Sequence, residues 1–141
     1  EHAIAFAQEV RRLSPFVPML PAFAREDFEW EGHQIKEGQR VIIDILGTNT
    51  DPNEWEEPLR FKPERFLGVE DAEAIKAFIP QGGGDVATGH RCPGEKVAVT
   101  ELAATVSALC QPGINIDPGD LDYDPTLMPT RPRSGGRVQK D

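Results

Sequence analysis

A glycine-rich segment around one cysteine carries the residues best suited to chemistry in this sequence. It runs from Phe78 to Gly94, places four glycines ahead of Cys92, and sets His90 and Arg91 directly before the cysteine. Glycine lets a large group approach the backbone, because it has no β-carbon and accepts angles closed to other residues. A helical pattern begins at Pro93. The helix dipole and the two basic side chains should therefore favour the thiolate, the form that binds metal or attacks carbon.

The residues around Cys92 argue against several common uses of a reactive cysteine. A structural zinc site needs further ligands at Cys-x-x-Cys or helical His spacing, and neither pair occurs. A P-loop ends in Gly-Lys-Ser or Gly-Lys-Thr, whereas Glu-Lys-Val follows Gly94, and a cysteine phosphatase needs an arginine where Ala98 stands. A cysteine hydrolase needs a base in hydrogen-bond geometry, for which the adjacent His90 is poorly placed. What remains is a single axial thiolate, which can hold haem iron.

Three motifs, in the same order as in this chain, resemble the haem-thiolate cytochrome P-450 superfamily. The loop with Cys92 and Gly94 resembles its cysteine loop, and Ala98 takes the small position of the following helix. Residues 9–12, Glu-Val-Arg-Arg, resemble its Glu-x-x-Arg motif, and residues 63–66, Pro-Glu-Arg-Phe, match its downstream element of that sequence. The resemblance implies the C-terminal part of one haem-binding domain over residues 1–141. The implied fold is α+β, mainly α with small antiparallel sheets, and its N-terminal part would be missing.

A departure from the usual loop narrows this resemblance. Most of the superfamily has Phe-x-Pro-Phe-Gly and reaches the cysteine sooner, whereas Gln81 replaces the second Phe here and Asp85 to Thr88 lengthen the approach. The loop is similar to that of the fatty-acid peroxygenases, which hydroxylate fatty acids near the carboxylate with hydrogen peroxide. The resemblance implies an oxidoreductase with haem b as cofactor, a fatty acid and hydrogen peroxide as partners, and no required redox partner.

The resemblance also implies which residues bind the cofactor, all of them in the cysteine loop. They are Cys92 as axial ligand and catalytic group, with His90, Arg91, Pro80, Gln81, Gly82 and Gly94. His90, or Arg91 as second choice, would face a haem propionate in a charge-assisted contact. Gln81 would add hydrogen bonding near the sulfur and tune the iron, because donors outside the ligand set have this effect on metal sites.

Two further sets of residues take roles from the resemblance. Phe16, Val17 and Met19 would line the fatty-acid pocket, where each buried methylene contributes about 0.8 kcal/mol. Glu9 and Arg12 share one helix face, which on its own predicts an exposed ion pair of little energetic weight. The resemblance instead implies that both meet Arg65 in a buried structural network beneath the haem.

Composition limits the classes of partner. The chain has 141 residues, 38% of them hydrophobic and 28% charged, and a formal net charge of -9. This acidic balance argues against a nucleic-acid partner, and no apolar run approaches the roughly 20 residues of a membrane span. A disulfide between Cys92 and Cys110 would remove the ligand, so we expect a reducing, cytoplasmic location.

The remaining pattern predicts the elements that position the loop. Apolar spacing predicts a helix from Ala3 that ends near Ser14, because Pro15 follows. Residues 16–23 predict a buried apolar connector, and residues 28–32 and 40–46 predict a small antiparallel sheet with turns at Gly32 and Gly38. His33 is expected at a solvated turn. Residues 49–63 predict a meander anchored by Trp55 and Phe61.

The C-terminal third predicts a helix and a hairpin. Apolar stripes after Pro93 predict a buried helix in which Cys110 is a small core residue, and Gln-Pro-Gly at 111–113 ends it. From Ile114 we expect a loose hairpin and a solvated basic tail. The tail contains Arg131, Arg133, Arg137 and Lys140.

Two alternatives to the peroxygenase interpretation stay open at this level. One is a conventional monooxygenase of the same superfamily, fed electrons by a reductase. The other is a fragment that binds no haem on its own. In the peroxygenase branch an arginine on the distal helix holds the substrate carboxylate, and that position would lie upstream of residue 1.

Overall fold

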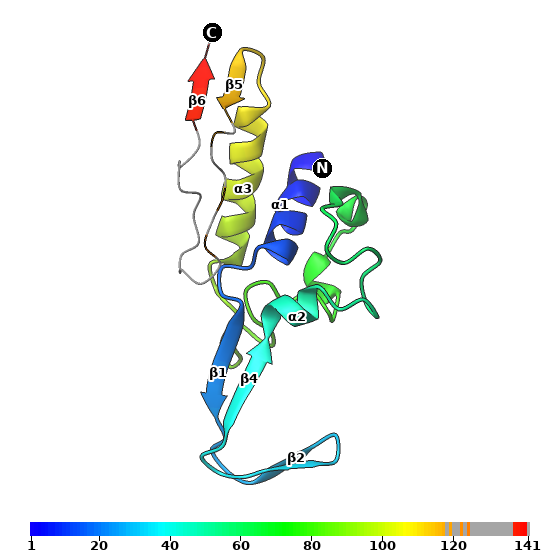
Figure 1. Cartoon of the computed structure of the whole chain (residues 1–141), viewed down its shortest axis with the longest axis vertical. Helices are drawn as coiled ribbons and strands as arrows, with labels where there is room; N and C mark the ends of the chain where they lie inside the picture. Colours follow the sequence, from blue (N-terminus) through cyan, green and yellow to red (C-terminus); the bar gives the residue numbers. More distant parts are fainter. Residues whose placement is uncertain (118, 120–121, 123, 125–136, 141) are drawn as a thin grey trace.

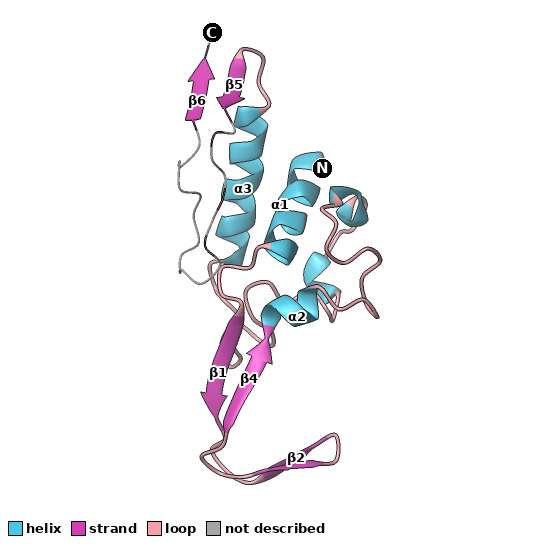
Figure 2. Ribbon diagram, in the orientation of Figure 1, coloured by secondary structure: helices cyan, strands magenta, loops and turns pink. Residues whose placement is uncertain are grey.

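The computed structural model describes residues 1–117, 119, 122, 124 and 137–140. Its helices and strands are, in chain order, α1 (His2–Leu13), β1 (Met19–Phe23), β2 (Phe28–Trp30), β3 (His33–Ile35), β4 (Arg40–Asp44), α2 (Ile45–Asn49), the 3-10 helices η1 (Pro63–Phe66) and η2 (Ala72–Ala74), α3 (Glu95–Leu109), β5 (Ile114–Asp117) and β6 (Arg137–Lys140). Helices α1 and α3 lie side by side, and the ladder of β1 and β4 extends away from them (Figures 1 and 2). The described part is therefore the α+β arrangement that the sequence predicts.

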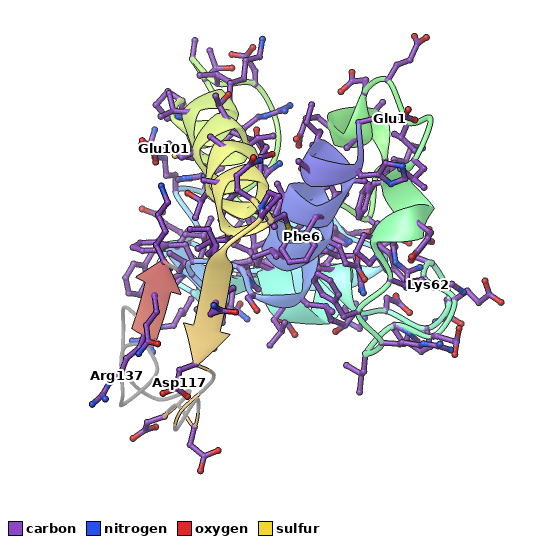
Figure 3. The ribbon with its side chains drawn as sticks, turned by 90° about the horizontal axis from the view of Figure 1, so that it is seen from above. Glu1, Phe6, Lys62, Glu101, Asp117 and Arg137 are labelled. Atoms are coloured by element: carbon purple, nitrogen blue, oxygen red, sulfur yellow. The ribbon has the colours of Figure 1, made fainter. Side chains whose placement is uncertain are left out.

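Helix α1 forms where the apolar spacing predicts it and ends at Ser14, whose N–H bonds to the Val10 carbonyl. Its most buried side is nevertheless largely polar. Gln8, Glu9, Arg11 and Arg12 are all buried, whereas the apolar residue Phe6 is 37% exposed. Seen from above, α1 lies between α3 and the segment that carries Lys62 (Figure 3). The buried charges therefore meet partners from several other segments.

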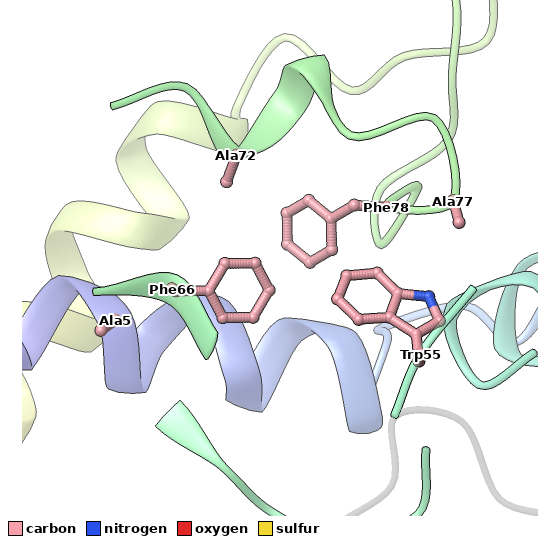
Figure 4. Packing of buried hydrophobic residues seen from close by; sticks show 6 residues of the cluster. All are labelled: Ala5, Trp55, Phe66, Ala72, Ala77 and Phe78. Atoms are coloured by element: carbon pink, nitrogen blue, oxygen red, sulfur yellow. The ribbon is translucent and has the colours of Figure 1, made fainter. Parts of the chain in front are cut away.

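A cluster of three aromatic rings forms the centre of the core. Trp55, Phe66 and Phe78 meet with ring centroids between 5.1 and 6.2 Å apart, and small alanines surround them (Figure 4). Trp55 is 6% exposed, which confirms it as an anchor of the meander. Phe61 packs edge-to-face on Phe6, but it stays 44% exposed and lies outside the buried core, so it is a weaker anchor than predicted. Phe78 is also the first residue of the cysteine loop, so the loop begins within this core.

The predicted sheet exists as strands but not as the predicted pairing. β2 pairs with β3 across a turn that contains Gly32, and β4 pairs instead with β1. Both turns form at Gly32 and Gly38 as expected, with φ of +78° and +76°. His33 lies in β3 rather than in the turn, and it is exposed. β4 ends at Asp44 because its side chain caps α2 through the Gly47 N–H.

The apolar connector at 16–23 forms strand β1 over Met19–Phe23, and none of its residues is buried. Met19 to Phe23 pair antiparallel with Asp44 to Arg40, and Phe16 and Phe23 are 71% and 64% exposed. Composition alone predicts burial here, but this ladder has only two strands and the described residues leave much of its surface uncovered. Its β4 end leads directly into α2, which places Ile45 beside the cysteine loop.

Helix α3 also differs from its prediction in burial. It begins at Glu95 and ends at Leu109, but only Glu95 is buried along its length, and Cys110 is exposed. Periodicity shows which faces of a helix are apolar, but it does not show whether other segments cover those faces. Among the described residues, the principal contacts of α3 are with α1 and β5.

The C-terminal hairpin is confirmed for its described part, where β5 pairs with β6 and Ile114 lies opposite Lys140. Arg137 and Lys140 are exposed within β6 rather than in a tail, and Arg131 and Arg133 lie outside the described residues. No helix in the described ranges is long and apolar enough to cross a membrane.

Candidate functional site

The cysteine loop folds back on itself, which brings Cys92 beside the start of the same loop. The Cys92 N–H donates to the Gln81 carbonyl at 3.0 Å, and the His90 N–H donates to the Gly83 carbonyl at 3.2 Å. Gly82 has φ +90°, and a Cβ there would collide with the His90 carbonyl. The glycine at position 82 is thus required by both backbone angle and space.

The longer approach from Asp85 to Thr88 is a self-contained turn. Asp85 Oδ1 accepts from the Ala87 N–H at 2.9 Å and from the Thr88 N–H at 3.0 Å. These bonds, with the Thr88 hydroxyl, lower the pKa of Asp85. Gly89 closes the turn through its N–H to the Asp85 carbonyl at 2.7 Å. The extra residues are therefore ordered by their own hydrogen bonds before the chain reaches the cysteine.

Helix α3 starts directly behind the cysteine. Gly94 is its N-cap, the Glu95 N–H donates to the Cys92 carbonyl at 3.3 Å, and the Ala98 N–H donates to the Gly94 carbonyl at 3.0 Å. A Cβ on Gly94 would lie 3.7 Å from Cys92 Sγ, which is ordinary contact. The positive end of the helix dipole thus lies beside the sulfur, as predicted.

Cys92 opens into a cavity of about 390 Å³ that is lined from both ends of the loop and from the β1–α2 region. The lining residues are Phe16, Val17, Leu20, Ile45, Pro80, Gln81, Gly89, His90, Arg91 and Cys92. Of the residues predicted to bind cofactor or substrate, Met19, Gly82 and Gly94 lie outside this lining, and Met19 is 49% exposed. Leu20, Ile45 and Gly89 line it without having been predicted.

The donor set at this cavity fits haem better than a bare metal ion. No group of three or more His, Cys, Asp or Glu side chains suited to a metal occurs in the described ranges, so a metal bound by Cys92 must need few protein ligands. Haem meets that condition, because its porphyrin supplies four ligands and asks the protein for one axial thiolate. The cavity wall of Phe16, Val17, Leu20 and Ile45 offers the apolar surface that a flat macrocycle needs.

The structure brings Glu9, Arg12 and Arg65 together, as the motif resemblance implies. Arg12 donates to both Glu9 carboxylate oxygens at 2.8 Å, and Arg65 Nε approaches the same carboxylate at 3.2 Å. Arg12 also donates to the carbonyls of Asn49 and Pro58 at 2.8 and 2.7 Å. Glu9 and Arg12 are 0% exposed, so the ion pair is buried rather than on the surface.

A second charged cluster, which the sequence analysis did not predict, surrounds the neighbouring Arg11. It consists of Arg11, Glu73, Arg91 and Glu95, which come from α1, η2, the cysteine loop and α3. Arg11 bonds to Glu73 Oε1 at 3.0 Å and also contacts Glu95, and Arg91 Nε donates to Glu95 at 2.7 Å. We call this the Arg11 cluster. The only sequence signal was the position of Arg11 in the Glu-x-x-Arg motif and of Glu95 directly after the cysteine loop.

The two carboxyl groups of the Arg11 cluster differ in pKa. Burial, and then the hydrogen bond shared with Glu95, raise the pKa of Glu73, and the opposing effect of Arg11 is smaller. Burial also acts to raise the pKa of Glu95, but hydrogen bonds from Arg91 and Glu73 and the charges of both arginines outweigh it and lower that pKa. As pH falls, Glu73 therefore takes up a proton before Glu95 does.

A comparison of the sequence with known protein families identifies the family of this chain. Residues 4–111 match the family described as cytochrome P-450, and this range contains both motifs and the whole cysteine loop. The chain belongs to the cytochrome P-450 family. Members of this family bind haem through an axial cysteine thiolate, and the matched range contains Cys92.

Relatives within the cytochrome P-450 family cover most of this chain but only part of their own length. Tabersonine/lochnericine 19-hydroxylase of Catharanthus roseus is 36% identical over 129 residues, 86% of this chain and 24% of the relative. A cytochrome P-450 monooxygenase, ple5B of Rhodocybe pseudopiperita, is 36% identical over 113 residues, 75% of this chain and 21% of the relative. The chain thus spans about a quarter of these curated relatives.

Solved cytochrome P-450 structures match almost the whole chain. Cytochrome P-450 EX alpha (CYP152N1) with myristic acid superposes with a TM-score of 0.82 and 40% identity, over 99% of this chain and 34% of the solved one. Ligand-free cytochrome P-450 OleT gives a TM-score of 0.82 and 37% identity, over 99% and 34% of the two chains. The arrangement of elements is therefore that of the corresponding third of these proteins.

Proposed function

We propose that this chain forms the cysteine-ligand part of a single haem-binding domain, in a peroxygenase that hydroxylates fatty acids near their carboxylate with hydrogen peroxide. The observation that carries the proposal is the Cys92 thiol opening into a cavity walled by Phe16, Val17, Leu20 and Ile45. The 40% identity to a structure with bound myristic acid, a fatty acid, supports the substrate class.

Several residues at the cavity and its edge take specific roles in this proposal. Haem, when bound, supplies oxidation at iron, with electron donation from the thiolate assisting O–O cleavage. Cys92 would bind the iron, with the N-terminus of α3 directly behind its sulfur. Arg91 is already paired with Glu73 and Glu95, so His90 is the better donor to a propionate. Phe16 and Val17 exclude water and contact the alkyl chain, and Met19 would join them at the cavity edge.

A reducing compartment such as the cytoplasm is part of the same proposal. Cys92 and Cys110 are both free and exposed. Oxidation of Cys92 to a disulfide would remove the anionic sulfur that iron requires.

A reductase-dependent monooxygenase is the second candidate, because one curated relative is named a monooxygenase and another a hydroxylase. The deciding assay gives the purified haem-loaded protein that contains this chain either myristic acid with hydrogen peroxide or the same acid with a reductase and NADPH. We expect hydroxylated acid in the peroxide reaction and none from Cys92→Ser. Product that requires the reductase, with none from peroxide, would contradict the peroxygenase proposal and favour the monooxygenase.

A further inference from the structure

A side-chain hydrogen bond links Arg11 of helix α1 to Gln81 of the cysteine loop. Arg11 Nε donates to Gln81 Oε1 at 3.0 Å, and the Gln81 carbonyl accepts from the Cys92 N–H at 3.0 Å. Gln81 and Cys92 also line the same cavity. Gln81 thus contacts Arg11 with its side chain and Cys92 with its backbone.

Arg11 is held in place from several directions, so it cannot easily turn away from this bridge. It is 5% exposed, contacts Gln8 and Glu95, and bonds to Glu73 at 3.0 Å. Its guanidinium carbon also lies 5.3 Å from the centre of the Phe78 ring. A guanidinium donates along fixed directions in its own plane, and these partners set that plane.

The chemistry of arginine then fixes the orientation of the Gln81 amide. Arginine has only N–H donors and no acceptor, so it must face the amide oxygen rather than the amide nitrogen. An amide carries its oxygen and nitrogen on opposite sides of one carbon. The Gln81 Nε2 group is therefore left on the side away from Arg11, and it bonds to none of the residues in the described ranges.

We propose that Arg11 is a positioning residue for the haem-thiolate site: by holding the Gln81 oxygen, it presents the Gln81 N–H2 group as a donor on the Cys92 side of the cavity. This inference rests on the proposed haem ligation by Cys92. A donor near a ligating sulfur withdraws electron density from it and raises the reduction potential of the metal. Arg11 acts on that potential only through Gln81.

The test measures haem reduction potentials by spectroelectrochemistry in the intact haem-loaded protein that contains this chain. The variants are wild type, Gln81→Met, Arg11→Lys, the double variant, and Lys36→Met as a control for loss of an exposed charge. Methionine matches glutamine in shape but has no donor. We expect Gln81→Met and Arg11→Lys each to lower the potential, and Lys36→Met to leave it unchanged.

The double variant separates positioning from a direct effect of charge, because residues that act through one another give non-additive changes. We expect it to match Gln81→Met alone. Equal shifts from Arg11→Lys in both backgrounds, or no shift in Gln81→Met, would overturn the inference. If Arg11→Lys does not fold, Gln81→Glu keeps an oxygen toward Arg11 and removes the donor. It should also lower the potential, and an unchanged value would overturn the inference.

The proposed function and this inference fail in different ways. A wild-type protein without a thiolate-type spectrum after reduction and carbon monoxide would overturn the proposed function, and the inference with it. A thiolate-type spectrum with unshifted potentials in the variants would overturn the inference alone.

Discussion

Arg11 and Arg12 are adjacent in α1 and almost equally buried, yet they hold different parts of the molecule together. Arg12 pairs with Glu9 on its own helix and with backbone carbonyls of the meander, including those of Asn49 and Pro58. Arg11 bonds instead to side chains that come from η2, α3 and the cysteine loop. The comparison indicates that Arg12 mainly stabilises the fold, whereas Arg11 mainly sets the geometry of the site.

The largest effect should come from Arg12→Ala. Removing one partner of a buried pair costs about 3–5 kcal/mol, because the other charge stays buried without it. Here the Asn49 and Pro58 carbonyls also lose their donor. We expect this loss in the free energy of unfolding, measured by urea titration of the intact protein. Glu57→Gln, which removes the carboxylate from two surface ion pairs, with Arg60 and Lys62, is the control and should leave the midpoint unchanged. Equal midpoints for Arg12→Ala and wild type would contradict a structural role for Arg12.

Two adjacent glycines test the loop without touching either arginine. Gly82→Ala meets the His90 carbonyl and must also adopt φ +90°, whereas an alanine at Gly83 finds Ile79 Cγ2 at an ordinary 3.5 Å. Strained backbone of this kind costs roughly 1–3 kcal/mol. We expect Gly82→Ala to lose most of its haem, measured as the ratio of Soret to protein absorbance. Gly83→Ala should keep its haem, and equal losses in the two variants would contradict the loop geometry.

The Arg11 cluster should respond to Glu95→Gln with a smaller loss of stability than the Arg12 network shows. Hydrogen bonds to charged groups contribute about 1.5–3 kcal/mol, and Glu95 accepts from both Arg11 and Arg91. We expect a moderate fall in the thermal midpoint and faster transfer of haem to an apoprotein acceptor. A fall as large as that of Arg12→Ala, with unchanged haem transfer, would remove the distinction between the two networks.

The smallest effect is a pH dependence that comes from Glu73. Its raised pKa means that the folded state binds its proton more tightly than the unfolded state does. This contribution to stability is complete below the ordinary glutamate pKa and is lost as pH rises through the folded pKa. Glu73→Gln imitates the protonated form. Its unfolding free energy should match wild type at low pH and exceed it near neutrality, and the opposite trend would show that folding lowers the pKa of Glu73 instead of raising it.

The Arg12 network could be predicted from the sequence because its residues belong to recognisable motifs. Glu9, Arg12 and Arg65 belong to two motifs, and α1 and α3 follow from apolar spacing. The Arg11 cluster was not predictable, because Arg11 meets Glu73 and Glu95 from 62 and 84 residues away, and no spacing rule joins them. The strand pairing was missed because β1 reads as a proline-rich connector. Exposure of α3 was missed because periodicity shows only which faces are apolar.

The measurement that tests the central claim most directly is the absorption spectrum of the intact protein, reduced and exposed to carbon monoxide, beside Cys92→Ser. Thiolate ligation predicts a red-shifted Soret band in wild type that disappears in Cys92→Ser, while circular dichroism stays the same. A wild-type protein without that band, or a Cys92→Ser variant that keeps it, would contradict the assignment of Cys92 as the haem ligand.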